Sequence, residues 1–399
     1  MTILCLASYE KGHRFLEECR RKGATVLLVS SLSLKDKARW PMEAINEIFY
    51  MPDTDHQWNR TDLVTAISHL GRTHEFDRIV GLDDFDVETA ALLREHLRVP
   101  GSGESTARYY RDKLAMRVRA RDASIAAPEF VHVLNYNRLR RFMDRVPPPW
   151  ILKPRSMAGA IGMRKIHSAD EFWRVIEQLG DTQSHYLLEQ FIPGDIFHVD
   201  SVVFDRSIRF AIASGYGRPP FEVSHEGGVF TSRVLDRTSS VARSLIRANE
   251  DVQWAFGLVR GVSHTEFIRA SEDGTIYFLE TSSRVGGAHV SDLIEAATGV
   301  NLWVEWARLE LAETPADYPS PSPRDDYAAL LVSLARERHP DHSVFADPEV
   351  VWRMQEDHHV GVIVRSQDQR RVESLLAQYT DRIRNDFWAY APARDKPTH

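Results

Sequence analysis

Hydrophobic blocks alternate with amphipathic stretches over the first hundred residues of the chain. The hydrophobic blocks predict strands at residues 3–8, 25–30 and 78–81. The amphipathic stretches predict helices at residues 14–22, 63–70 and 87–97. This alternation predicts a small parallel sheet covered by helices, a mononucleotide-type α/β domain. No G-x-G-x-x-G motif follows the first strand, so we do not expect a dinucleotide cofactor there.

An acidic run at residues 81–86 follows the third of these strands. Open α/β sheets bind ligands beyond the carboxyl ends of their strands, so a substrate contact is one interpretation. Acidic residues in a solvated loop are the alternative, and the composition of the run favours that alternative.

The pattern changes to longer extended stretches after residue 186, which predicts an α+β part. Strands are expected at residues 186–191, 198–204, 207–213, 264–269, 275–280 and 360–365. Helices are expected at residues 239–256, 290–297 and 369–384. Breaks rich in turn-forming residues lie near residues 100–103, 147–149 and 315–323. We therefore predict four domains, which span residues 1–104, 105–185, 186–318 and 319–399.

Composition and charge exclude several classes of protein. The chain of 399 residues has 43% hydrophobic and 27% charged residues, which is typical of a soluble globular protein. The formal net charge of -7 argues against a nucleic-acid surface, and no hydrophobic run is long enough to cross a membrane. Cys5 and Cys19 are expected to be buried, inert thiols in a reducing compartment. We therefore expect a cytoplasmic protein without nucleic-acid or membrane partners.

One candidate site follows the strand that ends at Lys153. The loop that follows, residues 154–162, is rich in small residues and includes Gly159 and Gly162. Backbone N–H groups of such a loop, together with the Lys153 ammonium, suit phosphate oxygens. The loop is not a Walker motif, and a glycine-containing hairpin turn would look the same.

A second candidate site lies on a predicted hairpin. Its strands carry Glu266 and Glu280, and residues 272–274 supply the turn. A three-residue turn, or a bulge with the same effect, would pair Glu266 with Glu280, whereas a two-residue turn would not. Two adjacent carboxylates repel unless a proton or cation lies between them, and Mg²⁺ prefers oxygen ligands. Two exposed strand glutamates are the alternative.

Arg284 follows the hairpin and could reach a phosphoryl or carboxylate oxygen with its fork of donors; a surface arginine is the alternative. His264 lies on the outgoing strand, and we expect it to be a hydrogen-bonded structural residue.

Taken in order along the chain, these segments resemble the ATP-grasp superfamily, and within it the carboxylate-amine ligases that include bacterial L-amino-acid ligases. The segment Asp112-Lys113-Leu114-Ala115-Met116-Arg117 is similar to a family helix, and residues 187–194 (LLEQFIPG) are similar to the hinge between its two lobes. The resemblance extends from the N-terminus to about residue 310. It implies that residues 1–104 form the N-terminal domain, 105–185 the small lobe, 186–318 the large lobe, and 319–399 a C-terminal α+β domain.

The resemblance also implies the roles of individual residues. Lys113 and Lys153 would reach the phosphates of ATP, and the loop with Ser156, Gly159 and Gly162 would cover them. The hinge would read the adenine edge through the backbone around Glu189, Gln190, Phe191 and Ile192. Glu266 and Glu280 would hold Mg²⁺, with Mn²⁺ as an allowed substitute, and Arg284 would stabilise the reacting groups.

Two positions depart from the family pattern. Asp195 follows the hinge glycine where many relatives carry a glutamate toward the ribose. Ser282 stands where the metal motif usually has an asparagine, and a hydroxyl is a weaker oxygen ligand than an amide carbonyl. We therefore expect a looser second metal position.

Substrate residues are expected in the loop at residues 219–232, with His225 and Glu226, and after the hairpin, with Gly287 and His289. An ordinary surface loop and a helix start are the alternatives.

The resemblance implies an ATP-dependent, ADP-forming ligase that joins a small carboxylate to an amine through an acyl phosphate, with amino acids as the expected substrates. It also allows a homodimer. An ATP-grasp enzyme that uses bicarbonate, a thiol or a phosphorylated metabolite is one alternative function. A nucleotide-binding sensor without turnover is another, although Arg284 disfavours it.

Overall fold

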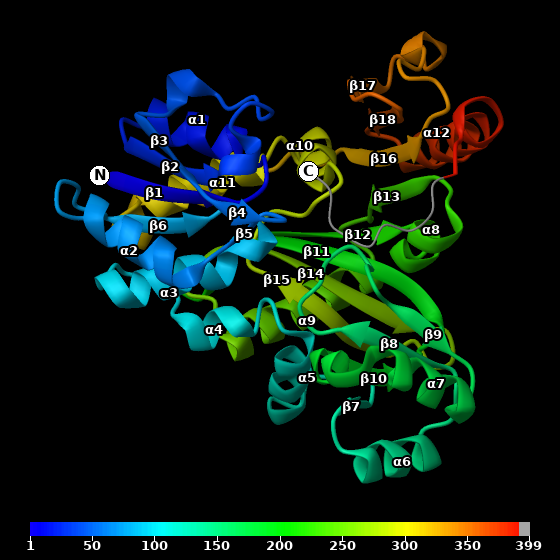
Figure 1. Ribbon diagram of the computed structural model, residues 1–399. Coiled ribbons are helices and arrows are strands. Elements are labelled where there is room, and N and C mark those ends of the chain that lie inside the picture. The colour runs from blue at the N-terminus through cyan, green and yellow to red at the C-terminus, as the bar shows by residue number, and fades with distance from the viewer. Residues whose placement is uncertain (391–399) are drawn as a thin grey trace.

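The structure is a computed structural model, which describes residues 1–390 (Figure 1). Within this range the strands form two four-stranded sheets, one eight-stranded sheet and a two-stranded ribbon. The mixed α/β and α+β architecture expected from the sequence is confirmed.

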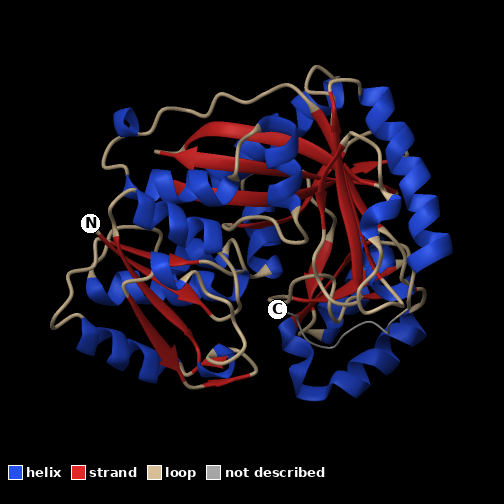
Figure 2. Ribbon diagram, turned by 90° about the horizontal axis from the view of Figure 1, so that it is seen from above, coloured by secondary structure: helices blue, strands red, loops and turns tan. Residues whose placement is uncertain are grey.

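The N-terminal domain contains a parallel sheet in the order β3-β2-β1-β6. Its strands are β1 (Thr2–Ala7), β2 (Thr25–Ser31), β3 (Glu47–Met51) and β6 (Arg78–Gly81). Helix α1 (His13–Arg21) covers one face, whereas α2 (Arg60–Leu70) and α3 (Val87–Leu97) cover the other (Figure 2). The ribbon of β4 (Asp53–Thr54) and β5 (Gln57–Trp58) follows β3. The strands and helices expected here are confirmed, and β3 is an additional strand.

A smaller antiparallel sheet has the order β7-β10-β8-β9. Its strands are β7 (Phe130–His132), β8 (Trp150–Pro154), β9 (Arg164–Ile166) and β10 (Tyr186–Gln190). The helices α6 (Tyr136–Arg145) and α7 (Ala169–Leu179) pack on it through a core that includes Leu139, Phe142, Trp150 and Phe172. The short α4 (Glu104–Arg108) and α5 (Lys113–Asp122) connect it to the N-terminal domain.

The largest sheet is antiparallel, in the order β15-β14-β11-β12-β13-β16-β18-β17. Five of its strands are β11 (Gly194–Phe204), β12 (Ser207–Tyr216), β13 (Phe230–Val234), β14 (Arg260–Ala270) and β15 (Ile276–Ser282). The helices α8 (Pro220–Glu226), α9 (Ser240–Phe256), α10 (Val290–Thr298) and α11 (Leu302–Leu311) belong to the same part of the chain.

The C-terminal strands continue this sheet. They are β16 (Tyr327–Leu334), β17 (Val350–Arg353) and β18 (His359–Ser366), and α12 (Gln369–Arg382) packs against them. Strand β16 pairs with β13, with Phe230 opposite Val332. No break in the sheet therefore coincides with residue 319, and the domain boundaries remain predictions.

Two further expectations can be checked. Within residues 1–390, no helix combines the length and the apolar character needed to cross a membrane. Cys5 and Cys19 are free and buried, as expected, and burial raises the pKa of both thiols far above the usual range.

Candidate active site

A cleft of about 700 Å³ lies between the small sheet and the large sheet. Eleven of the residues predicted from the sequence line it: Lys113, Lys153, Gly159, Glu189, Gln190, Phe191, Ile192, Glu266, Glu280, Arg284 and Gly287. The others lie outside its lining: Ser156, Gly162, Asp195, His225, Glu226, Ser282 and His289. The cleft is therefore built from both predicted lobes.

Glu266 on β14 pairs directly with Glu280 on β15. This confirms the predicted pairing, although the mechanism is a bulge. Phe267 pairs with Phe278, so Leu279 is the extra residue on β15. Consecutive residues of a regular strand point to opposite faces, but the bulge allows both Leu279 and Glu280 to line the cleft.

Two lysines that line the cleft are paired with carboxylates. The Lys113 Nζ atom lies 3.1 Å from Glu280 Oε2 and donates to the Met157 carbonyl at 2.7 Å. The Lys153 Nζ atom lies 2.5 Å from Glu189 Oε1, and Arg117 Nε donates to Glu189 Oε2 at 3.0 Å. Both lysines therefore hold their ammonium groups at the middle of the cleft.

The environment of Lys153 and Glu189 is closed to solvent. Burial lowers the pKa of Lys153 to about 8, although the charge of Glu189 opposes that change. Burial would raise the pKa of Glu189, but the charges of Arg117 and Lys153 hold it below its usual value. The Glu189 side chain is thus a buried, ionised partner of Lys153 and Arg117.

Glu266 is held ionised by its neighbours. Burial works to raise its pKa, but His264, whose Nε2 lies 3.7 Å from Oε1, lowers the pKa below the usual value. The Tyr216 hydroxyl donates to the same carboxylate at 2.9 Å. Two carboxylates from adjacent strands therefore face one cleft, and this donor set fits Mg²⁺.

Arg284 is held by a residue of the N-terminal domain. Its Nη2 donates to Asp84 Oδ2 at 3.2 Å, and the Ser282 hydroxyl donates to Asp84 Oδ1. Burial would raise the pKa of Asp84, but the charges of Arg284 and Arg111 hold it well below its usual range. Ser282 is thus engaged by Asp84, and its role as a metal ligand remains a prediction.

The acidic run at residues 81–86 is buried. Asp83 and Asp86 are each 1% exposed, and Asp84 is 7% exposed. The expectation of solvated loop acids is therefore wrong. Their position after the carboxyl end of β6 was the signal for a functional role, because strand ends converge on ligands in such sheets.

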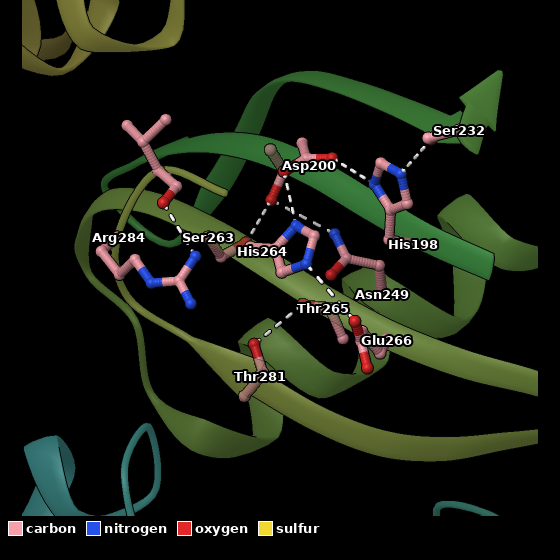
Figure 3. Close-up of polar contacts among 12 residues, drawn as sticks. His198, Asp200, Ser232, Asn249, Ser263, His264, Thr265, Glu266, Thr281 and Arg284 are labelled. Carbon is pink, nitrogen blue, oxygen red and sulfur yellow. Dashed lines mark hydrogen bonds and ion pairs between the residues drawn. The ribbon is translucent and has the colours of Figure 1, made fainter. Parts of the chain in front are cut away.

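His198, Asp200 and His264 form a polar cluster in which His198 and Asp200 are fully buried and His264 lines the cleft (Figure 3). The Nδ1 atoms of His198 and His264 lie 2.7 and 2.8 Å from the two oxygens of Asp200. Burial alone would lower the pKa of His264, but Asp200 raises it to about 9. His264 is a hydrogen-bonded structural residue, as expected.

The sequence analysis did not assign roles to His198 and Asp200. Their His-x-Asp spacing on β11, which places both side chains on one face, was the available signal. Figure 3 shows His264 between Asp200 and Glu266, so the cluster holds His264 next to one of the paired glutamates.

The predicted substrate loop contains the short helix α8, and this helix turns two of the selected residues away from the cleft. His225 Nδ1 lies 2.9 Å from the Phe221 carbonyl, and Glu226 pairs with Arg218 at 2.6 Å. Their neighbours Phe221 and Val223 line the cleft instead.

His289 is also turned away from the cleft. It begins α10 with a left-handed backbone and lies 2.9 Å from Asp292, and its ring centroid lies 4.6 Å from that of Trp352. His289 therefore has the structural role at a helix start that was the alternative to substrate binding. Gly287, by contrast, lines the cleft.

The chain resembles curated ligases in sequence, although no model of a known protein family matches it. It is 26% identical to an L-arginine-specific L-amino acid ligase of Bacillus subtilis over 60% of this chain and 59% of that protein. It is 23% identical to an alanine–anticapsin ligase of Bacillus subtilis over 63% and 58% of the two chains. The chain thus spans less than two thirds of the length of these relatives.

Solved structures share the fold over nearly the whole chain. An L-amino acid ligase from Bacillus licheniformis has a TM-score of 0.75 at 16% identity, covering 96% of this chain and 97% of that one. A carboxyaminoimidazole ribonucleotide synthetase from Thermus thermophilus has a TM-score of 0.72 at 16% identity, with 98% and 99% covered. The sequence similarity to these curated ligases and the fold shared with the solved structures together support an ATP-grasp protein of the carboxylate-amine ligase type.

Proposed function

We propose that the protein is an ATP-dependent, ADP-forming ligase that joins the carboxylate of one amino acid to the amine of another. The observation that carries the proposal is that Glu266, Glu280, Lys113, Lys153 and Arg284 line one cleft. A site that only bound the nucleotide would not require the buried guanidinium beyond the phosphate-binding lysines.

The nucleotide would occupy the end of the cleft between the small and large lobes, proposed as residues 105–185 and 186–318. Phe191 and Ile192 line that end and suit the apolar faces of adenine. Lys113 and Lys153 supply two positive charges for the phosphates. Glu266 and Glu280 would hold Mg²⁺, which neutralises charge on phosphate oxygens when it is bound.

The reaction would proceed in two steps. An oxygen of the substrate carboxylate attacks the γ-phosphorus of ATP. The bond between this phosphorus and the β,γ-bridging oxygen breaks, ADP leaves, and an acyl phosphate forms. The amine nitrogen then attacks the acyl carbon, inorganic phosphate leaves, and the nitrogen loses a proton. Phosphoryl transfer depends mainly on positioning and on stabilising charge, which are the roles assigned to Lys113, Lys153 and Arg284.

The test measures phosphate release from ATP and Mg²⁺ with a panel of amino-acid pairs, and identifies each product by mass. We expect release to require both a carboxylate and an amine and to yield a dipeptide with ADP. Phosphate release with a carboxylate but without any conjugate would favour another acceptor, an alternative supported by the shared fold of the carboxyaminoimidazole ribonucleotide synthetase. ATP binding without turnover on any substrate would favour a sensor.

A further inference from the structure

The side chains that β14 presents to the cleft change from apolar to charged along the strand. Side chains of Ile268, Glu266 and His264 share one face of this strand, with successive positions about 7 Å apart. Ile268 packs with Ile192 and Leu279 at the apolar end proposed for adenine. Glu266 is at the middle, and His264 and Arg284 mark the far end.

The wall of the cleft that β12, β13, α8 and the start of α10 form is mostly apolar. It comprises one aromatic residue each from β12 and β13, three residues of α8 and the first residue of α10. We call this the acyl chamber and define it by Tyr216, Pro220, Phe221, Val223, Phe230 and Val290, all of which line the cleft.

Few charged groups face this chamber. Among the described residues that line the cleft, the charged or titratable ones close to the chamber are His264, Glu266, Arg284 and Glu222. Tyr216 and His264 engage Glu266, Asp84 holds Arg284 through Nη2 at the reacting end, and Glu222 lies 3.5 Å from Arg218 with a side chain that is 44% exposed. A charged substrate side chain in the chamber would therefore lose water without gaining a buried partner of its own.

We propose that the acyl chamber binds the side chain of the carboxylate substrate and selects an aliphatic or aromatic side chain over a charged one. This inference rests on the proposed function. A carboxylate that lies between the phosphate-binding lysines and Arg284 directs its side chain away from the charged phosphates, toward the chamber. Each additional methylene that fits an apolar pocket improves discrimination by roughly ten- to two-hundredfold.

The experiment compares kcat/KM for leucine, phenylalanine, arginine, glutamate and glycine as the carboxylate substrate, with one fixed amine. Fragment masses of the product identify which amino acid supplied the carboxylate. We expect values for leucine or phenylalanine at least tenfold above those for arginine and glutamate. Equal or higher values for arginine or glutamate would overturn the inference while leaving the proposed function intact. Failure of every pair to release phosphate would contradict the proposed function itself.

Variants assign the selectivity to the chamber. Phe221→Ala should lower kcat/KM for phenylalanine roughly tenfold or more, leave KM for ATP unchanged, and leave glycine unaffected because glycine has no side chain. Val223→Asp should raise the ratio of arginine to leucine activity. Trp254→Ala, which removes a 66% exposed ring on α9 outside the cleft, is the matched control. An equal loss with glycine and phenylalanine in Phe221→Ala would contradict the assignment.

Discussion

Arg284 connects the cleft to the N-terminal domain through its contact with Asp84. Its Nη2 is held by Asp84 and its Nη1 donates to the Val285 carbonyl at 2.9 Å. Its Nε is buried without a hydrogen-bond partner. The guanidinium is therefore positioned from the N-terminal domain and retains a donor for a ligand.

We expect Arg284→Ala to lower kcat by a factor of about 10² to 10³ and to leave ATP affinity nearly unchanged. Loss of a donor to a developing oxyanion typically raises the barrier by about 2.7–4 kcal/mol. Phosphate release measures the first quantity and calorimetric titration with ATP the second. Unchanged turnover would show that Arg284 takes no part in the reaction.

Asp86 makes the stability of the protein depend on pH. Burial, followed by the charge of Asp83, raises its pKa to about 7, and its carboxylate accepts from the Ser8 amide at 3.0 Å. This pKa lies above the unfolded value of about 3.9. The contribution of Asp86 to the free energy of unfolding is therefore fully present below about pH 4 and is lost as the pH rises through 7.

Between pH 5 and pH 8, wild type should therefore lose more stability than Asp86→Asn, by on the order of 2 kcal/mol. Asparagine keeps an acceptor for the Ser8 amide and does not titrate. Urea unfolding of both proteins at the two pH values measures the difference. Identical losses would mean that Asp86 has the same pKa in both states.

Site residues that are close in sequence could be grouped from the sequence, whereas contacts between residues far apart in the chain could not be predicted. Glu266, Glu280 and Arg284 lie on one hairpin and its exit, so local alternation was enough to group them. Asp84 meets Arg284 across 200 residues, and no local pattern reports such a contact.

At the scale of the elements, the β14–β15 hairpin shows a further limit of sequence analysis. Turn composition indicated a register, and the register is correct for Glu266 and Glu280. A bulge was one of the two expected routes to this register, but its position at Leu279 was not predictable, because the carbonyl of Leu279 accepts from Arg117 on a distant helix at 2.5 Å. Similarly, the packing of α8 determines that Phe221 faces the cleft in place of His225.

The far side of this hairpin is attached to α9 by buried polar side chains. The Gln253 amide donates to Thr265 at 2.9 Å and to Thr281 at 3.3 Å. The hydroxyls of Thr265 and Thr281 lie 2.8 Å apart (Figure 3). Gln253 also accepts from the Tyr110 hydroxyl at 3.2 Å. These bonds hold β14 and β15 on the helix.

Gln253→Leu should lower the free energy of unfolding by about 1–3 kcal/mol, because buried hydroxyl groups lose their partner. Urea denaturation monitored by circular dichroism measures the loss. Glu250→Gln, at an exposed position of the same helix, is the control and should stay within about 0.5 kcal/mol of wild type. Similar losses in both variants would contradict a specific role for the buried network.

At the scale of the whole molecule, the alternating N-terminal domain was predictable from periodicity. The extension of the large sheet into the C-terminal strands was not predictable. Residues 319–399 were expected to form a domain of their own, but β16 pairs with β13 about a hundred residues earlier. Strand pairing over such distances depends on which edges remain free after folding, and the local sequence does not encode it.

A fragment of residues 1–322 should therefore fail to form a stable monomer. It would leave the edge of β13 unpaired and expose Val229, which packs against Leu331 and Val362 in the C-terminal core. Size-exclusion chromatography and thermal unfolding, with the full chain measured in parallel, test this expectation. A monomeric fragment that unfolds cooperatively and binds ATP would show that the C-terminal strands are dispensable.

The buried guanidinium of Arg117 has a consequence for motion. It bonds Glu189 of the small sheet and the Leu279 carbonyl of the large sheet, and these two sheets share no strand among the described residues. If the small sheet rotates, this doubly held point moves least, and displacement grows with distance from it. The outer helices α6 and α7 would travel furthest (Figure 1). Lys153, which shares Glu189 with Arg117, would hardly move, so such a rotation would widen the cleft at its rim more than around Lys153.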